Sequence, residues 1–95
     1  MEEEDWETLS YVKRSTYRTR ILRYLYQVDE PRTPTEIGSK TDISRSHVSW
    51  TLINLKDKNS GLVEVINPNA HYDRRYRITG KGQEIVEKIQ EIETE

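Results

Sequence analysis

A run of capping residues in the middle of the chain constrains the fold more than any other feature. Thr33 is a good N-cap, Pro34 suits the first helical position, and Glu36 stands where a capping box needs it. A second helix is expected to begin at Ser44. Its apolar residues are spaced three and four positions apart: Val48, Leu52 and Leu55. Because only residues 41–43 separate the two helices, the pattern predicts a helix-turn-helix unit.

A longer helix precedes this unit. Its apolar residues recur at three- and four-residue spacings, and Ser15 is a suitable N-cap. The helix is expected to end just before Pro31, because the residue before a proline is pushed out of the α region. Residues 1–10 hold five acidic residues and few apolar ones. They are therefore predicted to form an acidic N-terminal arm.

Two short strands and a last helix follow the helix-turn-helix unit. Residues 62–66 are rich in β-branched side chains, and residues 74–78 read as the returning strand of a hairpin. Thr79 caps an amphipathic helix within the C-terminal segment 80–95. The chain is therefore predicted to be mainly α with a small β-hairpin. Its expected fold is a winged helix-turn-helix over residues 11–79, with a three-helix core, a β-wing and a C-terminal helix.

The charge is distributed unevenly along the chain. The formal net charge is −2, yet residues 13–77 hold thirteen Lys and Arg against seven Asp and Glu. Both ends of the chain are acidic. A DNA phosphate responds to local potential rather than to the net charge, so the basic middle favours nucleic-acid binding.

The helix that begins at Ser44 is the expected recognition helix. Its first turn is small and polar, with donors for phosphates and base edges, and Arg45 suits guanine. Trp50 fits either a groove-facing position against sugars and thymine methyls or packing within the domain, and we favour packing. The candidate DNA contacts on this helix are Ser44, Arg45, Ser46, His47, Ser49, Trp50 and Asn54.

The hairpin supplies a second set of candidate DNA contacts, which are Arg74, Arg75 and Arg77. Arginine favours narrow, electronegative minor grooves, which a wing can reach. The alternative is that Arg75 and Arg77 pair with Glu64 across the hairpin. Weaker phosphate contacts are expected near helix starts, where backbone donors also help. These candidates are Lys13, Arg14, Arg18, Thr33 and Thr35.

The last helix carries an apolar stripe of Ile85, Val86, Ile89 and Ile92. A partner helix in a homodimer would cover such a stripe. The helix could also fold back on the first long helix, where Tyr24 and Leu25 are available, and both arrangements are compatible. We favour a homodimer whose interface includes the four stripe residues.

Several classes of protein do not fit this sequence. The chain has no cysteine, and its two histidines lie in distant segments, so no metal site is expected. No catalytic motif or phosphate-binding loop is present, so we expect neither an enzyme nor a cofactor. No apolar run is long enough to cross a bilayer, and the acidic start is unlike a secretory signal. The expected location is the cytoplasm.

The motifs together resemble archaeal winged helix-turn-helix regulators, which are similar in fold to the MarR and ArsR groups. The most specific runs are Ser46-His47-Val48-Ser49 and Thr79-x-Lys81-Gly82, and the resemblance spans residues 9 to about 87. It implies a DNA-binding transcriptional regulator with its recognition helix at 44–56 and its wing at 67–75. The sequence departs from the pattern at Trp50, where arginine is usual, and in a longer turn at 58–61.

Three functions follow from these observations. The leading hypothesis is a homodimer that binds specific double-stranded DNA sequences in transcriptional control. The alternative is a winged-helix module for protein–protein contacts in a transcription or replication assembly, because fold alone does not decide function. A ligand-sensing regulator would need a pocket at the dimer interface, lined by Trp6, Tyr11, Tyr24 or Tyr26.

Overall fold

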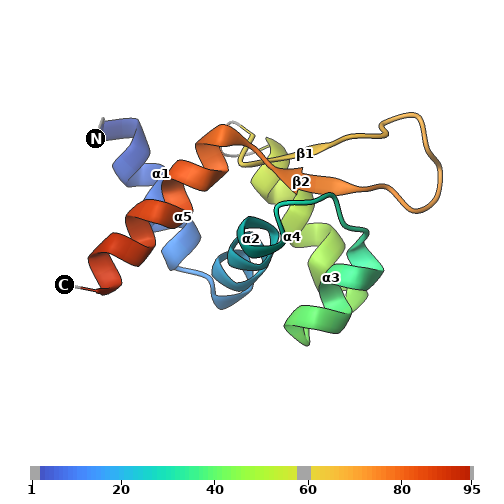
Figure 1. Ribbon diagram of the computed structural model, residues 1–95, viewed down its shortest axis with the longest axis horizontal. Coiled ribbons are helices and arrows are strands. Elements are labelled where there is room, and N and C mark those ends of the chain that lie inside the picture. The colour runs from blue at the N-terminus through green and yellow to red at the C-terminus, as the bar shows by residue number, and fades with distance from the viewer. Residues whose placement is uncertain (1–2, 58–60, 95) are drawn as a thin grey trace.

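The computed structural model describes residues 3–57 and 61–94. In chain order its elements are α1 (Glu3–Lys13), α2 (Thr16–Val28), α3 (Pro34–Thr41), α4 (Arg45–Asp57), β1 (Val63–Val65), β2 (Tyr76–Ile78) and α5 (Gly80–Glu93). Figure 1 shows α3, α4 and the hairpin at one end of the molecule, with α1 and α5 at the other and α2 between them. This arrangement confirms the predicted winged helix-turn-helix.

The hydrophobic core is built around α2. Ile21, Leu22 and Leu25 are completely buried, and α2 packs against α1, α3, α4 and α5. Leu52 and Leu55 of α4 join the same cluster. Because one helix contacts all the others, the position of the helix-turn-helix unit is fixed relative to α1 and α5.

The predicted helix caps are present. Ser15 accepts a hydrogen bond from the Arg18 amide, and Thr33 and Glu36 form the full capping box. Asp42 ends α3 in the left-handed conformation, with φ 59°. This residue turns the chain sharply, so that α4 begins three residues later and packs against α3.

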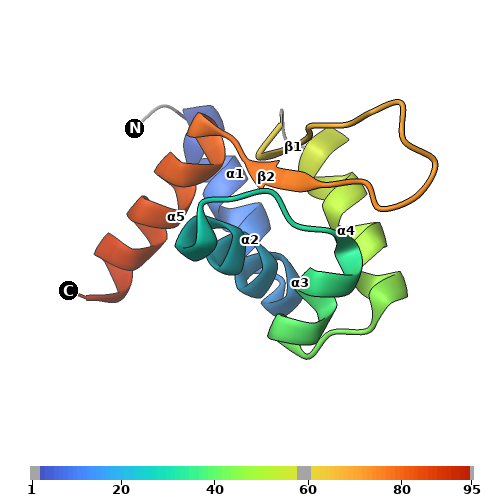
Figure 2. The same cartoon turned by 45° about the vertical axis from the view of Figure 1, so that its right-hand side comes forward.

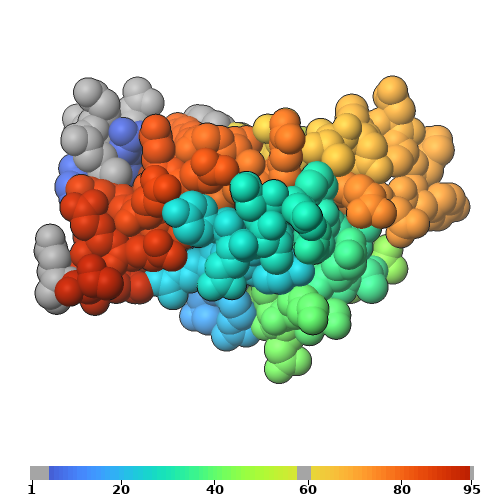
Figure 3. Space-filling view, in the orientation of Figure 1, coloured from blue at the N-terminus to red at the C-terminus, as the bar shows by residue number. Residues whose placement is uncertain are grey.

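The wing is a two-stranded antiparallel hairpin in which Val63 pairs with Ile78 and Val65 with Tyr76. The backbone of Arg32 pairs with β2 next to the hairpin: its amide donates to the Tyr76 carbonyl, and its carbonyl accepts from the Tyr76 amide, each at 2.8 Å. Both strands are shorter than predicted, and Arg74 and Arg75 lie in the connecting loop. Residues 58–60, where the turn after α4 was expected, lie outside the described part of the chain. The space-filling view shows the wing loop projecting beyond the helices (Figure 3).

The N-terminal segment differs from the expected arm. From Glu3 onward it is the helix α1, which packs along α5 (Figure 2). Leu9 and Val12, three residues apart, are buried on its inner face. The apolar face is narrow and its partner helix is about 70 residues away in sequence, so no local pattern indicated that this segment is covered.

The C-terminal stripe also differs from the expected dimer interface. Ile85, Val86 and Ile89 are at most 1% exposed within the single chain, and Ile92 is half-buried. They are covered by α1 and α2, which corresponds to the second arrangement considered for this helix. Three of the four predicted interface residues are therefore core residues of the chain itself.

Candidate nucleic-acid interface

The side of α4 that faces away from the core forms an open surface. Val48, Leu52 and Leu55 are completely buried on one side of the helix, whereas Arg45, Ser46 and His47 are exposed. Serine at position 44 orders the first turn: its hydroxyl accepts from the His47 amide at 3.4 Å and lies 2.9 Å from the His47 Nδ1. The first turn of α4, with its small polar side chains, is therefore accessible and has a defined conformation.

Trp50 does not pack within the domain, contrary to the expectation we favoured. Its side chain is 65% exposed, and Ile53, one turn further along α4, is 44% exposed. Asn54 and Ser49 are half-buried at the edges of the same surface. The exposed face of α4 thus has an apolar centre with polar edges.

His47 connects this surface to the start of α2. Its ring lies 5.2 Å from the ring of Tyr17, centroid to centroid, at an interplanar angle of 39°. Tyr17 belongs to the apolar residues of α2 that recur at three- and four-residue spacings, yet its side chain is 40% exposed. Tyr17 is thus part of the candidate surface that sequence reasoning missed.

A small cleft of about 170 Å³ separates the helix-turn-helix unit from the wing. It brings together four of the predicted DNA contacts, one from α3, two from α4 and one from the wing: Thr35, Arg45, Ser49 and Arg74. His71, Tyr72 and Asp73 also line it and were not predicted. Their loop position carried no periodic signal that could have identified them.

The wing loop is held by its own hydrogen bonds. Asn67 accepts from the Arg75 amide at 2.7 Å and donates to the Asp73 carbonyl at 3.2 Å. The Arg74 Nε donates to the Ala70 carbonyl at 3.0 Å. These bonds give the arginines of the loop a defined position beside α3 and α4.

The other two wing arginines have acidic neighbours. Arg77 lies 3.5 Å from Glu64, which is the cross-hairpin pairing considered from the sequence. Arg75 instead lies 3.8 Å from Glu36 on α3 and remains half exposed. Both arginines are about half exposed beside a carboxylate, and Arg75 lies where the wing meets the helix-turn-helix unit.

Two predicted phosphate contacts are used inside the fold. Arg18 donates to the Tyr11 carbonyl at 2.6 Å, and its guanidinium lies 3.7 Å from the centre of the Tyr11 ring. Thr33 is buried and caps α3. Hydrogen bonds from the Thr33 amide and hydroxyl lower the pKa of Glu36, with a smaller contribution from Arg75. Lys13 and Arg14 are exposed where α1 ends.

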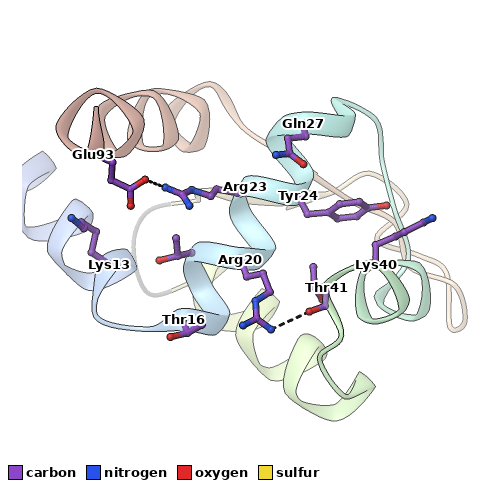
Figure 4. Close-up of a pocket in the computed structure, with 10 residues that line it drawn as sticks. Lys13, Thr16, Arg20, Arg23, Tyr24, Gln27, Lys40, Thr41 and Glu93 are labelled. Atoms are coloured by element: carbon purple, nitrogen blue, oxygen red, sulfur yellow. Dashed lines mark hydrogen bonds and ion pairs between the residues drawn. The ribbon is translucent and has the colours of Figure 1, made fainter. Parts of the chain in front are cut away.

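A second, larger cleft of about 510 Å³ lies between the end of α1, α2, α3 and the end of α5 (Figure 4). Its charged lining is basic, with Lys13, Arg20, Arg23 and Lys40 against Glu93. Arg20 donates to the Thr41 carbonyl at 3.1 Å, and Arg23 pairs with Glu93. Of the four aromatic residues expected to line a ligand pocket, Tyr24 lines this cleft, and Trp6, Tyr11 and Tyr26 do not.

Within the described ranges, no group of three or more His, Cys, Asp or Glu side chains is placed to hold a metal ion. In the same ranges, none of the helices combines the length and apolar character needed to span a bilayer.

Comparison with solved structures identifies the fold. A MarR family transcription regulator is 23% identical with a TM-score of 0.65, and the match covers 80% of this chain and 50% of that one. The MepR–DNA complex of Staphylococcus aureus is 20% identical with a TM-score of 0.73, covering 97% and 74%. NadR in complex with 4-hydroxyphenylacetate is 20% identical with a TM-score of 0.70, covering 92% and 60%. This chain thus spans half the length of the first structure, and at these identities the likeness is one of fold.

Comparison of the sequence itself identifies the family. No curated protein matches this sequence. A family model described as EarA-like matches residues 8–89, from α1 into the last turns of α5. Because the match spans most of the chain, the protein belongs to the EarA-like family, and its fold is the winged helix found in MarR-type regulators.

Proposed function

We propose that this chain is a transcriptional regulator that binds specific sequences in double-stranded DNA. In this proposal α4 enters the major groove, and the loop between β1 and β2 contacts the adjacent minor groove or backbone. Its fold neighbours are transcription regulators, and one of them was solved bound to DNA. The proposed archaeal source rests on the sequence resemblance described above, and we keep the cytoplasm as its expected location.

One observation carries this proposal: polar and basic side chains from three separate segments meet at one exposed cleft. Thr35 lies in the first turn of α3, Arg45 in the first turn of α4, and Arg74 in the wing loop. Groups of this kind bind phosphates and base edges. The N-termini of α3 and α4 add backbone N–H donors and the positive ends of the helix dipoles, and both favour the binding of phosphate groups.

The test is fluorescence anisotropy of a labelled random-sequence duplex titrated with the protein at two salt concentrations. We expect affinity to fall with salt, because phosphate contacts release counterions. The double variant Arg45→Ala/Arg74→Ala should bind about tenfold more weakly, with a salt slope shallower by about one to two. The matched control is Lys81→Glu on α5, which lowers the net charge by the same amount at a helix remote from the cleft.

The outcomes separate the competing functions. Salt-dependent binding that is lost in the Arg45/Arg74 variant and kept in the α5 control supports the DNA-binding proposal. Equal losses in both variants would mean that net charge alone drives binding, and would contradict the proposed surface. No binding by the wild type at low salt would favour the alternative, a winged-helix module for protein–protein contacts.

A homodimer remains part of the proposal, through a surface other than the buried stripe of α5. Among the large apolar side chains described as exposed, Trp6 is the one carried by the α1–α5 pair, at 48% exposure. An exposed tryptophan is a common anchor of protein interfaces. Sedimentation velocity should find a dimer that Trp6→Ala shifts toward monomer, and a wild-type monomer at all concentrations would contradict this part.

Regulation by an anionic small molecule is a second candidate, which the basic cleft beside α2 favours. Lys13, Arg20 and Arg23 line it, and the Arg23 Nε is buried without a hydrogen-bond partner among the described residues. The fold neighbour NadR was solved with 4-hydroxyphenylacetate, which is an aromatic carboxylate. Thermal denaturation with this compound should raise the Tm of the wild type by mass action but not that of Lys13→Gln/Arg20→Gln. An equal rise in both proteins, or none in the wild type, would exclude this site for that ligand.

A further inference from the structure

The outward face of α4 has a tryptophan at its centre. Successive residues of an α-helix are about 100° apart, so positions 46, 50 and 53 lie on one stripe. The buried residues Val48, Thr51, Leu52 and Leu55 define the opposite side. Trp50 therefore projects away from the core, and its 65% exposure agrees with this position.

Trp50 has no stacking partner inside the domain. Among the residues that the structure describes, its ring takes part in none of the aromatic or cation–π contacts. A tryptophan side chain carries a large apolar surface, and leaving it in water forfeits the favourable burial of that surface. An exposed aromatic residue flanked by polar groups is typical of a binding surface.

The groups around Trp50 indicate the chemistry of its partner. On one side lie Arg45 and Ser49, which share a cleft with Arg74 of the wing. On the other side the ring of His47 lies beside that of Tyr17 in a tilted arrangement. An apolar centre between donor-bearing edges complements the major groove, where phosphate backbones border the base edges. The thymine C5-methyl is the apolar group that the groove presents to a protein.

We propose that Trp50, with Ile53 one turn further on, contacts thymine C5-methyl groups and so biases the binding site toward thymine-containing steps. This inference rests on the proposed function, because it requires α4 to lie in the major groove. It assigns to the α4 surface a specificity that depends on apolar contact rather than on hydrogen bonds alone.

The experiment begins with selection of bound duplexes from a random pool by the wild-type protein. Each thymine of the selected site is then replaced in turn by deoxyuridine, which removes only the methyl group and keeps the base pairing. We expect one or two positions at which affinity falls about fourfold, the factor that corresponds to the transfer of one methyl-sized group. Trp50→Ala should bind more weakly and should lose the sensitivity at those positions, whereas Trp50→Phe should keep it.

The outcomes distinguish the inference from the proposed function. Specific binding without any effect of deoxyuridine, or a selected site without thymine, overturns the inference and leaves the proposed function standing. Equal sensitivity in the wild type and Trp50→Ala also overturns it, because another residue would then contact the methyl. Failure of the wild type to bind DNA at low salt overturns both. A thermal melt of each variant checks folding, and the wild-type deoxyuridine scan needs no variant.

Discussion

Replacing Gly82 with alanine should destabilise the fold, whereas the same change at Gly80 should stabilise it. Both glycines lie in the first turn of α5, and neither has a positive φ. A Cβ at position 82 would lie 2.6 Å from Cγ1 of Ile78 and closer still to the carbonyl oxygen of Leu62. At position 80, a Cβ would meet nothing within 4 Å among the described residues. The pair therefore compares one chemical change in a crowded site and in an open one.

The expected magnitudes follow from two opposing effects. Alanine in place of glycine in a helix gains at most about 1 kcal/mol, and less at the first helical position, so Gly80→Ala should gain about 0.5 kcal/mol. Overpacking costs typically 1–3 kcal/mol, and a fixed backbone carbonyl cannot rotate away, so about 3 kcal/mol is expected at position 82. Gly82→Ala should then lose about 2 kcal/mol after the helix gain.

Thermal denaturation followed by circular dichroism measures the difference. For a domain of this size 1 kcal/mol corresponds to a shift in Tm of about 4–8 °C. Gly82→Ala should thus melt about 8–16 °C below the wild type, and Gly80→Ala a few degrees above it. A Gly82→Ala protein that melts at or above Gly80→Ala would refute the close packing of α5 on the hairpin.

Two further predictions concern α3 and α5. Because its hydrogen bonds with Thr33 lower the pKa of Glu36 in the fold, this group stabilises the protein above the ordinary carboxyl pKa, and the contribution is lost as the pH falls through the lowered value. Glu36→Gln should flatten the acid limb of a Tm–pH profile relative to the exposed control Glu84→Gln, and parallel profiles would contradict the capping role. Ile85→Ala should cost about 2–5 kcal/mol at every protein concentration, because this side chain is buried within the chain. A loss of stability confined to high concentration would instead indicate a dimer contact.

The sequence predicted those parts of the fold that depend on local chemistry. Ser15, Thr33 and Thr79 cap the helices that they were expected to cap, because capping needs only residues within one turn. The short turn was likewise expected at residues 41–43, where the structure adds that Asp42 closes it in the left-handed conformation. Together these local signals were sufficient to order the elements into a winged helix-turn-helix.

Features that depend on distant contacts were not predicted. α1 lacks a strong apolar pattern and is held by α5, and the stripe of Ile85 and Ile89 faces this chain rather than a partner. The exposure of Trp50 is a different case, because the spacing of Val48, Leu52 and Leu55 already places position 50 on the opposite side of the helix, and the favoured packing of this residue was wrong. The basic cleft around Arg20 is lined by residues from four helices. These residues are far apart in the sequence and come together only in the tertiary structure.

The central claim is that α4 and the wing form the DNA-binding surface. The most direct test is to follow the backbone amide resonances of the isotopically labelled protein during titration with a duplex. The account predicts shifts concentrated in residues 44–50 and 67–75, with little change along α5. Shifts confined to α1 and α5, or no change at low salt, would contradict it.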